Sequence, residues 1–397
     1  MKRLLIINFL VFMVIGIIGC APSQTVTDGS TAPTTGEKKQ EAEKHYSIGY
    51  EYLKQGKYDE ALINFDKAIE LYPQYYAAYI VLAQTYRAKR DISAAETQYI
   101  TAKKVDHNDP RAYEGLGALY TELKRYGDAI VEYASGLKVD STNVNILNGL
   151  GYVYMKRQEY DKALSYYYKS IEYEPENLST MYAIADVYIE KGEPNKAVDY
   201  YRELVRRKPK NTEIRRKLAE TLTDLKRYDE AIEQYEYLLA EDPDNCTLCL
   251  QSGLVYQRLK KYSAARTQFT KARQLEPDNP LPVLYLADLN IAQKQYAAAE
   301  NLVKEALKLE PGSMYGQILL GDIYLRRGSN ARDIWLNNKS KKNCPTLDSA
   351  INHLRTAISH YTRAKTDDMF GSYAKTEITR CNNWTEQLSE DKWFYCK

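Results

Sequence analysis

The sequence has 397 residues, with 55 Lys and Arg against 53 Asp and Glu. Two of the basic residues, Lys2 and Arg3, fall in a segment predicted below to be removed, which leaves 53 basic against 53 acidic residues. This balance argues against a nucleic-acid-binding protein, which would carry a basic excess or a basic stripe. Tyrosine is over-used, at 37 residues against 6 Phe and 3 Trp, and this bias needs a structural cause.

The N-terminus has the pattern of an export signal. After Lys2 and Arg3, residues 4–19 are apolar with one exception, and this stretch is too short to form a membrane-spanning helix. It ends in Gly19-Cys20, preceded by two isoleucines, which resembles the lipobox of bacterial lipoproteins. The resemblance implies that a signal peptide of residues 1–19 is removed and that Cys20 is acylated, with palmitate among the acyl groups. The chain would then be anchored to an envelope membrane.

A polar segment follows the predicted lipidation site. Residues 20–41 are rich in Pro, Ser, Thr, Gly and charged residues, so they are expected to form a flexible tether. Ala21 stands where an Asp would signal inner-membrane retention, by analogy with enterobacterial sorting. The analogy favours the outer membrane, with the protein facing the periplasm.

From Ala42 the chain repeats with a fixed number of residues per unit. Gly49, Ala83 and Gly117, for example, are equivalent positions in three successive units. Position 8 of the unit is small, in Gly49, Ala83, Gly117, Gly151, Ala185, Ala219, Gly253, Ala287 and Gly321. Position 20 is alanine in the first eight units, in Ala61, Ala95, Ala129, Ala163, Ala197, Ala231, Ala265 and Ala299. Position 24 is aromatic in Phe65, Tyr99, Tyr133, Tyr167, Tyr201, Tyr235 and Phe269, and fails only at Val303. The interval and these positions resemble the signature of the tetratricopeptide repeat (TPR) over about residues 42–365.

Two antiparallel helices explain these positions. Small residues let the helix axes approach, and aromatic rings fill the gaps between neighbouring helices, so most of the tyrosine excess is scaffold. Aspartates at position 18, namely Asp59, Asp161 and Asp229, are predicted to cap the second helix. The resemblance implies an all-α fold, a right-handed superhelical α-solenoid of about nine helix-turn-helix units, with the regular array over residues 42–326.

The ninth unit departs from the period. Gly321 is in register, but position 20 would fall on Asp333, which is neither small nor apolar. Ala350 is predicted to occupy position 20 instead. The number of residues from Asp333 to Ala350 is then the length of an insertion that lies within residues 327–346. Residues 347–397 then hold the last repeat helix and a C-terminal cap. The cap is predicted as a helix from the spacing of Phe370, Ala374, Ile378, Cys381, Trp384 and Leu388.

No group of residues in the sequence points to catalysis. The four histidines are His45, His107, His353 and His360; His353 and His360 share a face of one predicted helix, but no Cys or acidic residue accompanies them at metal-ligand spacing. A phosphate-binding glycine loop, a nucleophile elbow and a zinc-protease helix are all missing from the sequence. The sequence therefore predicts a protein that is not an enzyme, with no catalytic residue, metal or cofactor.

The cysteines leave several alternatives open. Cys246 and Cys249 form a Cys-x-x-Cys pair at a predicted helix start, which could be a disulfide, two buried thiols or a redox pair. The redox interpretation lacks the βαβ pattern in which this motif usually occurs. Of Cys344, Cys381 and Cys396, two could form a disulfide that stabilises the C-terminal region, and the sequence does not choose among the three pairings.

The resemblance also implies a binding surface. In this family the first helices line a concave groove, and their positions 2, 5, 9, 12 and 13 point into it. Carried onto this chain, they predict a partner-binding groove formed by Tyr46, Tyr50, Gln84, Arg87, Asn148, Tyr152, Tyr182, Asp186, Arg216, Leu250, Leu254 and Asp288. This mixture of aromatic, polar and aliphatic side chains suits an extended peptide or a helix.

The sequence as a whole predicts a lipid-anchored scaffold or assembly adaptor of a bacterial cell envelope. Its partner would be a protein segment bound in the groove, with no nucleic acid involved. An alternative of a different class is a carbohydrate-binding or polysaccharide-export accessory lipoprotein that uses groove tyrosines such as Tyr50 and Tyr152. The sequence leaves the partner, the organism and the oligomeric state open.

Overall fold

The computed structural model describes residues 34–396. The predicted signal peptide, Cys20 and the tether up to residue 33 lie outside the described residues. The described part divides into two compact units, with the boundary after Leu119, and each is described by itself. The first contains α1 (Thr35–Lys54), α2 (Tyr58–Leu71), α3 (Tyr76–Ala88), α4 (Ile92–Val105) and most of α5 (Arg111–Glu122).

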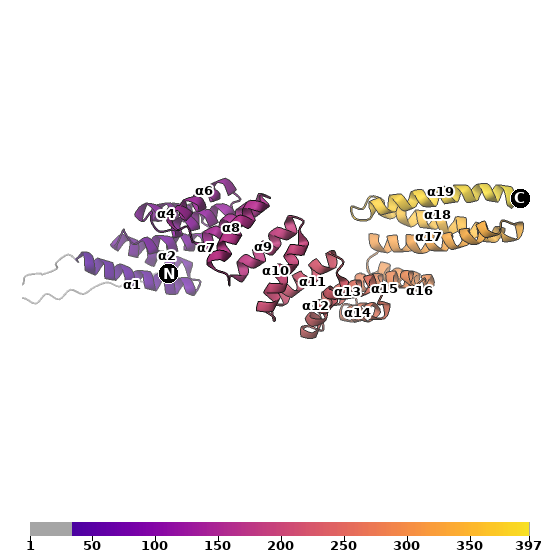
Figure 1. Cartoon of the computed structure of the whole chain (residues 1–397), viewed down its shortest axis with the longest axis horizontal. Helices are drawn as coiled ribbons and strands as arrows, with labels where there is room; N and C mark the ends of the chain where they lie inside the picture. Colours follow the sequence, from indigo (N-terminus) through magenta and orange to yellow (C-terminus); the bar gives the residue numbers. More distant parts are fainter. Residues whose placement is uncertain (1–33, 397) are drawn as a thin grey trace, which may run out of the picture. The chain divides into compact units, whose positions relative to one another are not determined.

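The second unit continues the same pattern of short helices. It holds α6 (Tyr126–Val139), α7 (Val144–Lys156), α8 (Tyr160–Tyr173), α9 (Leu178–Glu190), α10 (Pro194–Arg207), α11 (Thr212–Asp224), α12 (Tyr228–Glu241), α13 (Cys246–Arg258), α14 (Tyr262–Leu275), α15 (Pro280–Ala292), α16 (Tyr296–Leu309), α17 (Met314–Asn337), the 3-10 turn η1 (Lys341–Asn343), α18 (Cys344–Ala364) and α19 (Gly371–Tyr395). From α6 to α19 each helix packs against the next in chain order (Figure 1). The predicted all-α fold of consecutive helix pairs is confirmed.

The repeated small and aromatic residues form the core of each hairpin. All eight alanines of position 20 are fully buried, and the aromatic rings of position 24 are buried beside them. A Cβ added to Gly253 would lie 2.5 Å from the ring of Phe269, and one added to Gly151 would lie 2.7 Å from the ring of Tyr167. The ring of the second helix therefore lies directly on the glycine of the first, which is why the two positions repeat together.

The turn inside each regular hairpin has one left-handed residue. Position 15 has a positive φ in each of the first eight units, at Gly56, Arg90, Lys124, Gln158, Gly192, Lys226, Lys260 and Lys294. Only Gly56 and Gly192 adopt this conformation without the steric cost that a Cβ brings.

The predicted caps of the second helices are wrong. Asp59, Asp161 and Asp229 each occupy the second residue of their helix, where no capping hydrogen bond forms. They instead reach the next turn along the chain, in ion pairs with Lys89, Lys191 and Lys261. Side-chain caps occur mainly on the first helices, from Asn143, Asn177, Asn211, Asn245 and Asn279.

The first helix begins earlier than predicted. α1 starts at Thr35 because Thr34 and Glu37 form a capping box, in which Glu37 accepts the backbone N–H of Thr34 at 2.7 Å. The flexible tether predicted for residues 20–41 is therefore wrong for residues 35–41. Their composition resembles a loop, but the Thr-Glu pair provides a helix start.

The insertion in the ninth unit is helical and longer than predicted. It extends α17 to Asn337 and lets α18 start at Cys344, so residues 327–346 are mostly helix rather than a loop. The ring of Tyr361 lies 2.5 Å from a Cβ built on Gly321, which makes this pair the equivalent of Phe269 and Gly253. Because Tyr361 occupies position 24 of the ninth unit, position 20 is Ala357. Without an insertion, position 20 would be Asp333, so the inserted length is the number of residues from Asp333 to Ala357.

The error in the length of the insertion has a geometric cause. Ala357 lies seven positions after the predicted Ala350. This offset makes about two helical turns, so both alanines lie on the same face of α18. Both are fully buried, and the apolar pattern could not distinguish them.

The C-terminal cap is confirmed as a helix. α19 packs on α18 and buries Ala374, Cys381 and Leu388 at helical spacing. A disulfide joins Cys344, at the start of α18, to Cys396, just after α19, with 5.8 Å between their Cα atoms. Of the three pairings that the sequence left open, the structure has this one, and Cys381 is a buried free thiol.

Candidate functional site

Two cavities of the second unit are lined by predicted groove positions of its first helices. α7 contacts α9, α13 contacts α15, and α15 contacts α17, so first helices of neighbouring hairpins lie next to one another. Positions 9, 12 and 13 of these helices line both cavities. Some of the positions that the TPR resemblance predicts as groove-facing therefore line these two cavities.

The first cavity lies across α7, α9 and α11 and has a volume of about 500 Å³. Its lining includes four carboxylates, two lysines and, besides Tyr160, the tyrosine that contacts Asp186. The residues are Asp186, Glu190, Glu220, Asp224, Lys156, Lys217 and Tyr201. With more acidic than basic groups, this cavity favours a cationic side chain from a partner.

Asp186 is the most constrained of these carboxylates. It accepts a hydrogen bond of 2.9 Å from the hydroxyl of Tyr201, whose ring is the buried position 24 of the same hairpin. Burial raises the pKa of Asp186, although the Tyr201 hydrogen bond and the nearby Lys217 act in the opposite direction. Its charge is therefore incompletely compensated inside the protein, and a partner cation would stabilise it.

The second cavity lies across α13, α15 and α17 and has a volume of about 700 Å³. It is mainly apolar and aromatic, lined by Leu254, Tyr262, Leu281, Tyr285, Ala292, Tyr315, Met369 and Phe370, with Asp288, Gln257, Arg258 and Lys260 as its charged and amide groups. Phe269, Tyr285, Tyr315 and Phe370 form one row of rings with centroid separations of 5.3, 5.9 and 5.7 Å. An apolar bowl with a few polar groups is suited to an aliphatic or aromatic side chain.

The polar groups of the second cavity are partly satisfied within the protein. Asp288 accepts a hydrogen bond of 2.9 Å from the side-chain amide of Gln257. The other amide atom, Oε1 of Gln257, is buried and has no hydrogen-bond partner. A buried acceptor without a donor is costly, so a ligand N–H at this point would be favourable.

The first unit gathers tyrosines around the start of α3. The ring of Tyr46 lies 6.3 Å from Tyr50 and 5.1 Å from Tyr75, centroid to centroid, and Tyr75 lies 6.1 Å from Tyr72. Tyr50 is 42% exposed, so the group has an open aromatic face.

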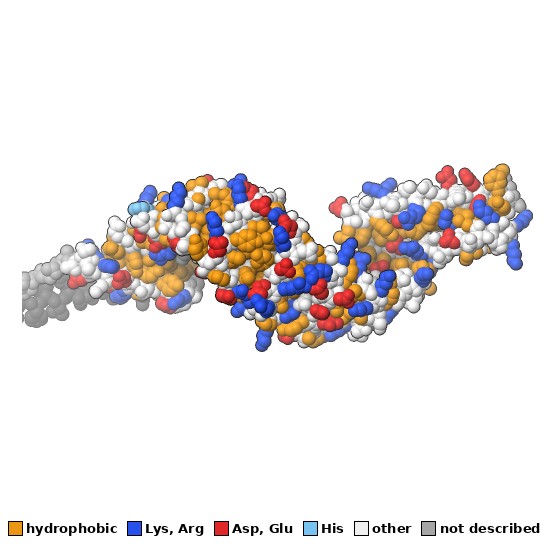
Figure 2. All heavy atoms as spheres, in the orientation of Figure 1, with side chains coloured by type: hydrophobic (Ala, Val, Ile, Leu, Met, Phe, Trp, Pro, Cys, Tyr) orange, Lys and Arg blue, Asp and Glu red, His pale blue; other side chains and the backbone are white. Residues whose placement is uncertain are grey.

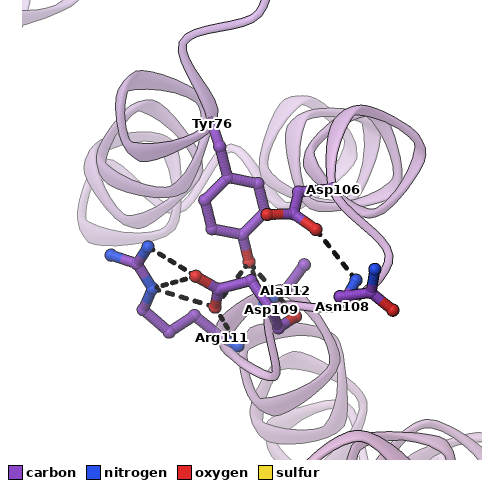
Figure 3. Close-up of polar contacts among 6 residues, drawn as sticks. All are labelled: Tyr76, Asp106, Asn108, Asp109, Arg111 and Ala112. Atoms are coloured by element: carbon purple, nitrogen blue, oxygen red, sulfur yellow. Dashed lines mark hydrogen bonds and ion pairs between the residues drawn. The ribbon is translucent and has the colours of Figure 1, made fainter.

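A polar network beside these tyrosines joins α3 to α5 (Figure 3). The hydroxyl of Tyr76 donates to Asp109 at 3.1 Å and accepts the backbone N–H of Ala112 at 2.9 Å. Arg111 donates to both carboxylate oxygens of Asp109, and its guanidinium lies 5.0 Å from the centre of the Tyr76 ring. These contacts hold the pKa of Asp109 below its usual value in spite of burial, and they fix the two helix starts.

The predicted groove residues fall into three groups. Asp186 lines the first cavity, Leu254 and Asp288 line the second, and Tyr182 and Arg216 line smaller hollows. Tyr50, Gln84 and Tyr152 are exposed, whereas Tyr46, Arg87, Asn148 and Leu250 are half-buried. Asn148 accepts a hydrogen bond from Thr180, and Leu250 packs into the core, so both contribute to the fold as well.

The sequence analysis missed several cavity residues. Tyr285 and Lys217 occupy position 6, which the family framework does not count as groove-facing. Tyr315 occupies position 2 of the ninth unit and could have been found from the framework. Phe370 directly precedes the capping helix; its spacing marked it as part of that helix, but nothing in the sequence marked it as a cavity residue.

The Cys-x-x-Cys pair does not form a disulfide. Cys246 and Cys249 are both buried free thiols, which is one of the three alternatives. The disulfide is absent because the sulfurs face different surroundings, Cys246 near the carbonyl of Ala272 and Cys249 near that of Pro243. Burial raises the pKa of Cys246 to about 11 and also raises that of Cys249, the opposite of what a redox-active thiolate needs.

Other site types can be assessed over residues 34–396. In this range no cluster of three or more His, Cys, Asp or Glu side chains could hold a metal ion. His353 and His360 lie beside the ring of Tyr324, at 6.0 and 5.7 Å between ring centres. None of the helices described is both long enough and apolar enough to cross a bilayer.

Comparison with protein families agrees with the repeat geometry. Models described as tetratricopeptide repeat match residues 52–119, 143–210, 182–245 and 256–323, and a TPR repeat model matches residues 117–157. The chain belongs to the tetratricopeptide repeat family. The TPR matches end at residue 323, so they stop inside α17, close to where the ninth hairpin departs from the regular length.

Individual relatives cover parts of this TPR chain. The type IV pilus assembly protein PilF of Pseudomonas aeruginosa is 30% identical over 123 residues, which are 30% of this chain and 47% of PilF. The chain thus spans about half the length of this curated relative.

Parts of the chain are also similar to solved structures. PilW, described as a widely conserved type IV pilus biogenesis factor, is 17% identical, with a TM-score of 0.46 over 51% of this chain and 94% of PilW. A TPR protein from Parabacteroides merdae is 18% identical, with a TM-score of 0.45 over 64% of this chain and 99% of its own.

Proposed function

We propose that this chain is a non-enzymatic assembly adaptor that holds a segment of a partner protein in the groove of its second unit. The observation that carries the proposal is the row of rings in the second cavity, where Tyr285, Tyr315 and Phe370 surround about 700 Å³ of open space. A regular hairpin needs no such row for its own core. An anchoring side chain from a partner would bury these rings and supply most of the binding energy.

The two cavities differ in chemistry and would fix the direction of the bound segment. The first cavity has more carboxylates than basic groups around Asp186, and the second is mainly aromatic. A partner segment with a basic residue at one end and an apolar residue at the other would satisfy both. A segment with the opposite order would place its cation against the rings and its apolar residue among carboxylates.

Two features support a location in the bacterial envelope. The Cys344–Cys396 disulfide is typical of proteins from oxidising compartments such as the periplasm. The predicted export signal and the lipidation of Cys20 agree with this, and a lipid anchor in the outer membrane is part of the proposal. The similarity to PilF suggests assembly of pilus-type machinery as the class of work.

A pull-down from cross-linked cells tests the adaptor proposal. Leu254→Asp places a charge in the aromatic cavity, and the expected result is loss of a specific envelope protein that the unaltered chain recovers. Val131→Asp, at a residue 62% exposed on the second helix of its hairpin, is the matched control and should recover that protein normally. Circular dichroism melting verifies that both variants fold. Recovery of the same proteins by Leu254→Asp would rule out the groove as the working surface.

The alternative of carbohydrate binding rests on the first unit. Tyr50 is 42% exposed and stacks on Tyr46, a geometry that suits the flat face of a sugar ring. Glycan-array binding that is lost in Tyr50→Ala and kept in Tyr58→Ala would favour this alternative. Tyr58 is similarly exposed, at 38%, but starts a second helix. If the unaltered chain binds no glycan, the carbohydrate-binding alternative is eliminated.

A further inference from the structure

The insertion in the ninth hairpin builds a segment with its own small core. We call residues 332–348 and 388–396 the C-terminal tip; they comprise the end of α17, the turn η1, the start of α18 and the end of α19. Trp335, Leu347 and Leu388 are fully buried there, and the Trp335 indole N–H donates to Asp391 at 2.8 Å. The Cys344–Cys396 disulfide closes the tip. The tip is therefore well fixed, although it extends past the length of a regular hairpin.

Large apolar side chains are exposed at the end of this fixed segment. Ile334 is 58% exposed, Trp393 59%, Phe394 71% and Tyr395 44%. Figure 2 shows hydrophobic side chains standing at the C-terminal end of α19, with basic side chains next to them. Exposed aromatic residues gathered at one place usually mark an interaction surface, because leaving them in water is unfavourable.

The charged residues of the tip leave this surface apolar and slightly basic. The described tip carries five basic residues, Arg332, Lys339, Lys341, Lys342 and Lys392, against four acidic ones, Asp333, Asp348, Glu390 and Asp391. Three of the four acidic residues are engaged in ion pairs within the tip, Asp333 with Arg332, Asp348 with Lys392 and Asp391 with Lys339. Lys341 and Lys342 are exposed in the turn between α17 and α18.

We propose that the tip is a membrane-contacting site that inserts Trp393 and Phe394, whose rings lie 4.8 Å apart, at the boundary between lipid headgroups and acyl chains. Trp and Tyr beside lysines are the residues that gather at this boundary, where rings meet the acyl chains and ammonium groups meet the phosphates. The lipidation predicted at Cys20 would already hold the chain at a lipid surface. The chain would then contact the membrane near both of its ends. This proposal does not depend on what binds in the groove.

The three tryptophans make the proposal measurable by fluorescence. Trp335 is fully buried, and Trp384 is half-buried beneath the guanidinium of Arg332, at 4.5 Å from its ring centre. Trp393 is thus the tryptophan that acyl chains could reach. The full-length protein is mixed with vesicles of phosphatidylethanolamine and phosphatidylglycerol whose acyl chains are brominated, since bromine quenches tryptophan on contact.

The expected result is a quenched and blue-shifted emission that Trp393→Phe abolishes. Phe394→Ser keeps the reporter and should weaken insertion by about tenfold, because the exposed ring next to Trp393 is removed. Val131→Ser is the matched control; this residue is 62% exposed on α6, outside the tip and outside both cavities, and its change should leave quenching unaltered. Absence of quenching in the unaltered chain, whether or not it sediments with the vesicles, would overturn the proposal. Equal quenching in Phe394→Ser would overturn it as well.

Discussion

The eight regular hairpins and the C-terminal helices α17–α19 use the same packing rule and stabilise it differently. In both, a large side chain of the second helix packs on a small residue of the first, as Phe269 does on Gly253 and Tyr361 on Gly321. A regular hairpin then buries its remaining surface against neighbours on both sides. The ninth hairpin extends beyond that support, and its outer part depends on a disulfide, a buried Trp335 and the cap α19. The repeated small and large residues thus determine how the two helices of a hairpin cross, whereas the longer helices of the ninth hairpin need additional stabilising contacts.

Removing the disulfide should have the largest effect on stability, and it should affect only the C-terminal helices. The double change Cys344→Ser, Cys396→Ser opens a loop whose ends are separated by 52 residues in sequence and is expected to lower the stability of the C-terminal region by about 4 kcal/mol. Hydrogen exchange should accelerate across α19 and the outer ends of α17 and α18. Exchange in α7–α14 serves as the internal control and should not change. Faster hydrogen exchange throughout the second unit would contradict the claim that the disulfide stabilises the C-terminal helices separately from the regular hairpins.

Filling the glycine positions should affect regular and irregular hairpins alike. Gly253→Leu and Gly321→Leu each force a side chain into a ring 2.5 Å from the Cβ, with an expected loss of about 3 kcal/mol in unfolding free energy. Gly127→Ala is the control, because nothing lies within 4 Å of its added Cβ, and it should be neutral or slightly stabilising. Urea unfolding measures all three. A much smaller loss for Gly321→Leu would argue against the pairing of Gly321 with Tyr361, and so against the length assigned to the insertion.

The junction between the two regions should depend on pH through Glu300. This carboxylate of α16 accepts hydrogen bonds from Tyr324 and Arg327 of α17 and from Lys304. Burial alone would raise its pKa, but these partners lower it to about 2. Because the folded pKa lies below the unfolded one, the stabilisation is present above about pH 4.5 and is lost as the pH falls toward 2.

Glu300→Gln is therefore expected to cost about 2 kcal/mol at pH 7 and progressively less in acid. Denaturant unfolding of both proteins at pH 7 and at pH 3 checks this. A difference between the two proteins that stays constant with pH would mean that the charge of Glu300 contributes nothing.

The smallest effect concerns the turns of the regular hairpins. Lys226 adopts a φ of 59°, so Lys226→Gly should stabilise the protein by about 1 kcal/mol. Gly192 has the same position and a φ of 81°, and Gly192→Ala should destabilise by a similar amount. Thermal melting compares the two. Changes of the same sign would show that the left-handed turn does not limit stability.

The regular hairpins could be predicted from sequence because each depends on local spacing. The alanines of position 20 and the rings of position 24 identify both helices and their crossing. The early start of α1 was missed because a single Thr34–Glu37 pair outweighs the composition of the segment. The length of the insertion was missed because Ala350 and Ala357 are two turns apart on one face.

The candidate site was predicted only where the family framework applies. Asp186, Leu254 and Asp288 occupy groove positions and line the cavities. Tyr285 lines the second cavity from a position that the framework omits, and Phe370 comes from outside the repeats. The partner of Cys344 could not be chosen from sequence, since it depends on how far α18 and α19 extend.

The most direct test of the proposed groove is site-specific photocrosslinking in cells. A benzophenone amino acid is placed at Tyr285, in the row of rings, or at Val131, on an exposed second-helix face. The account predicts one discrete crosslinked envelope protein from position 285 and none from position 131. Equal products from both positions, or none from position 285, would contradict a partner bound in the groove.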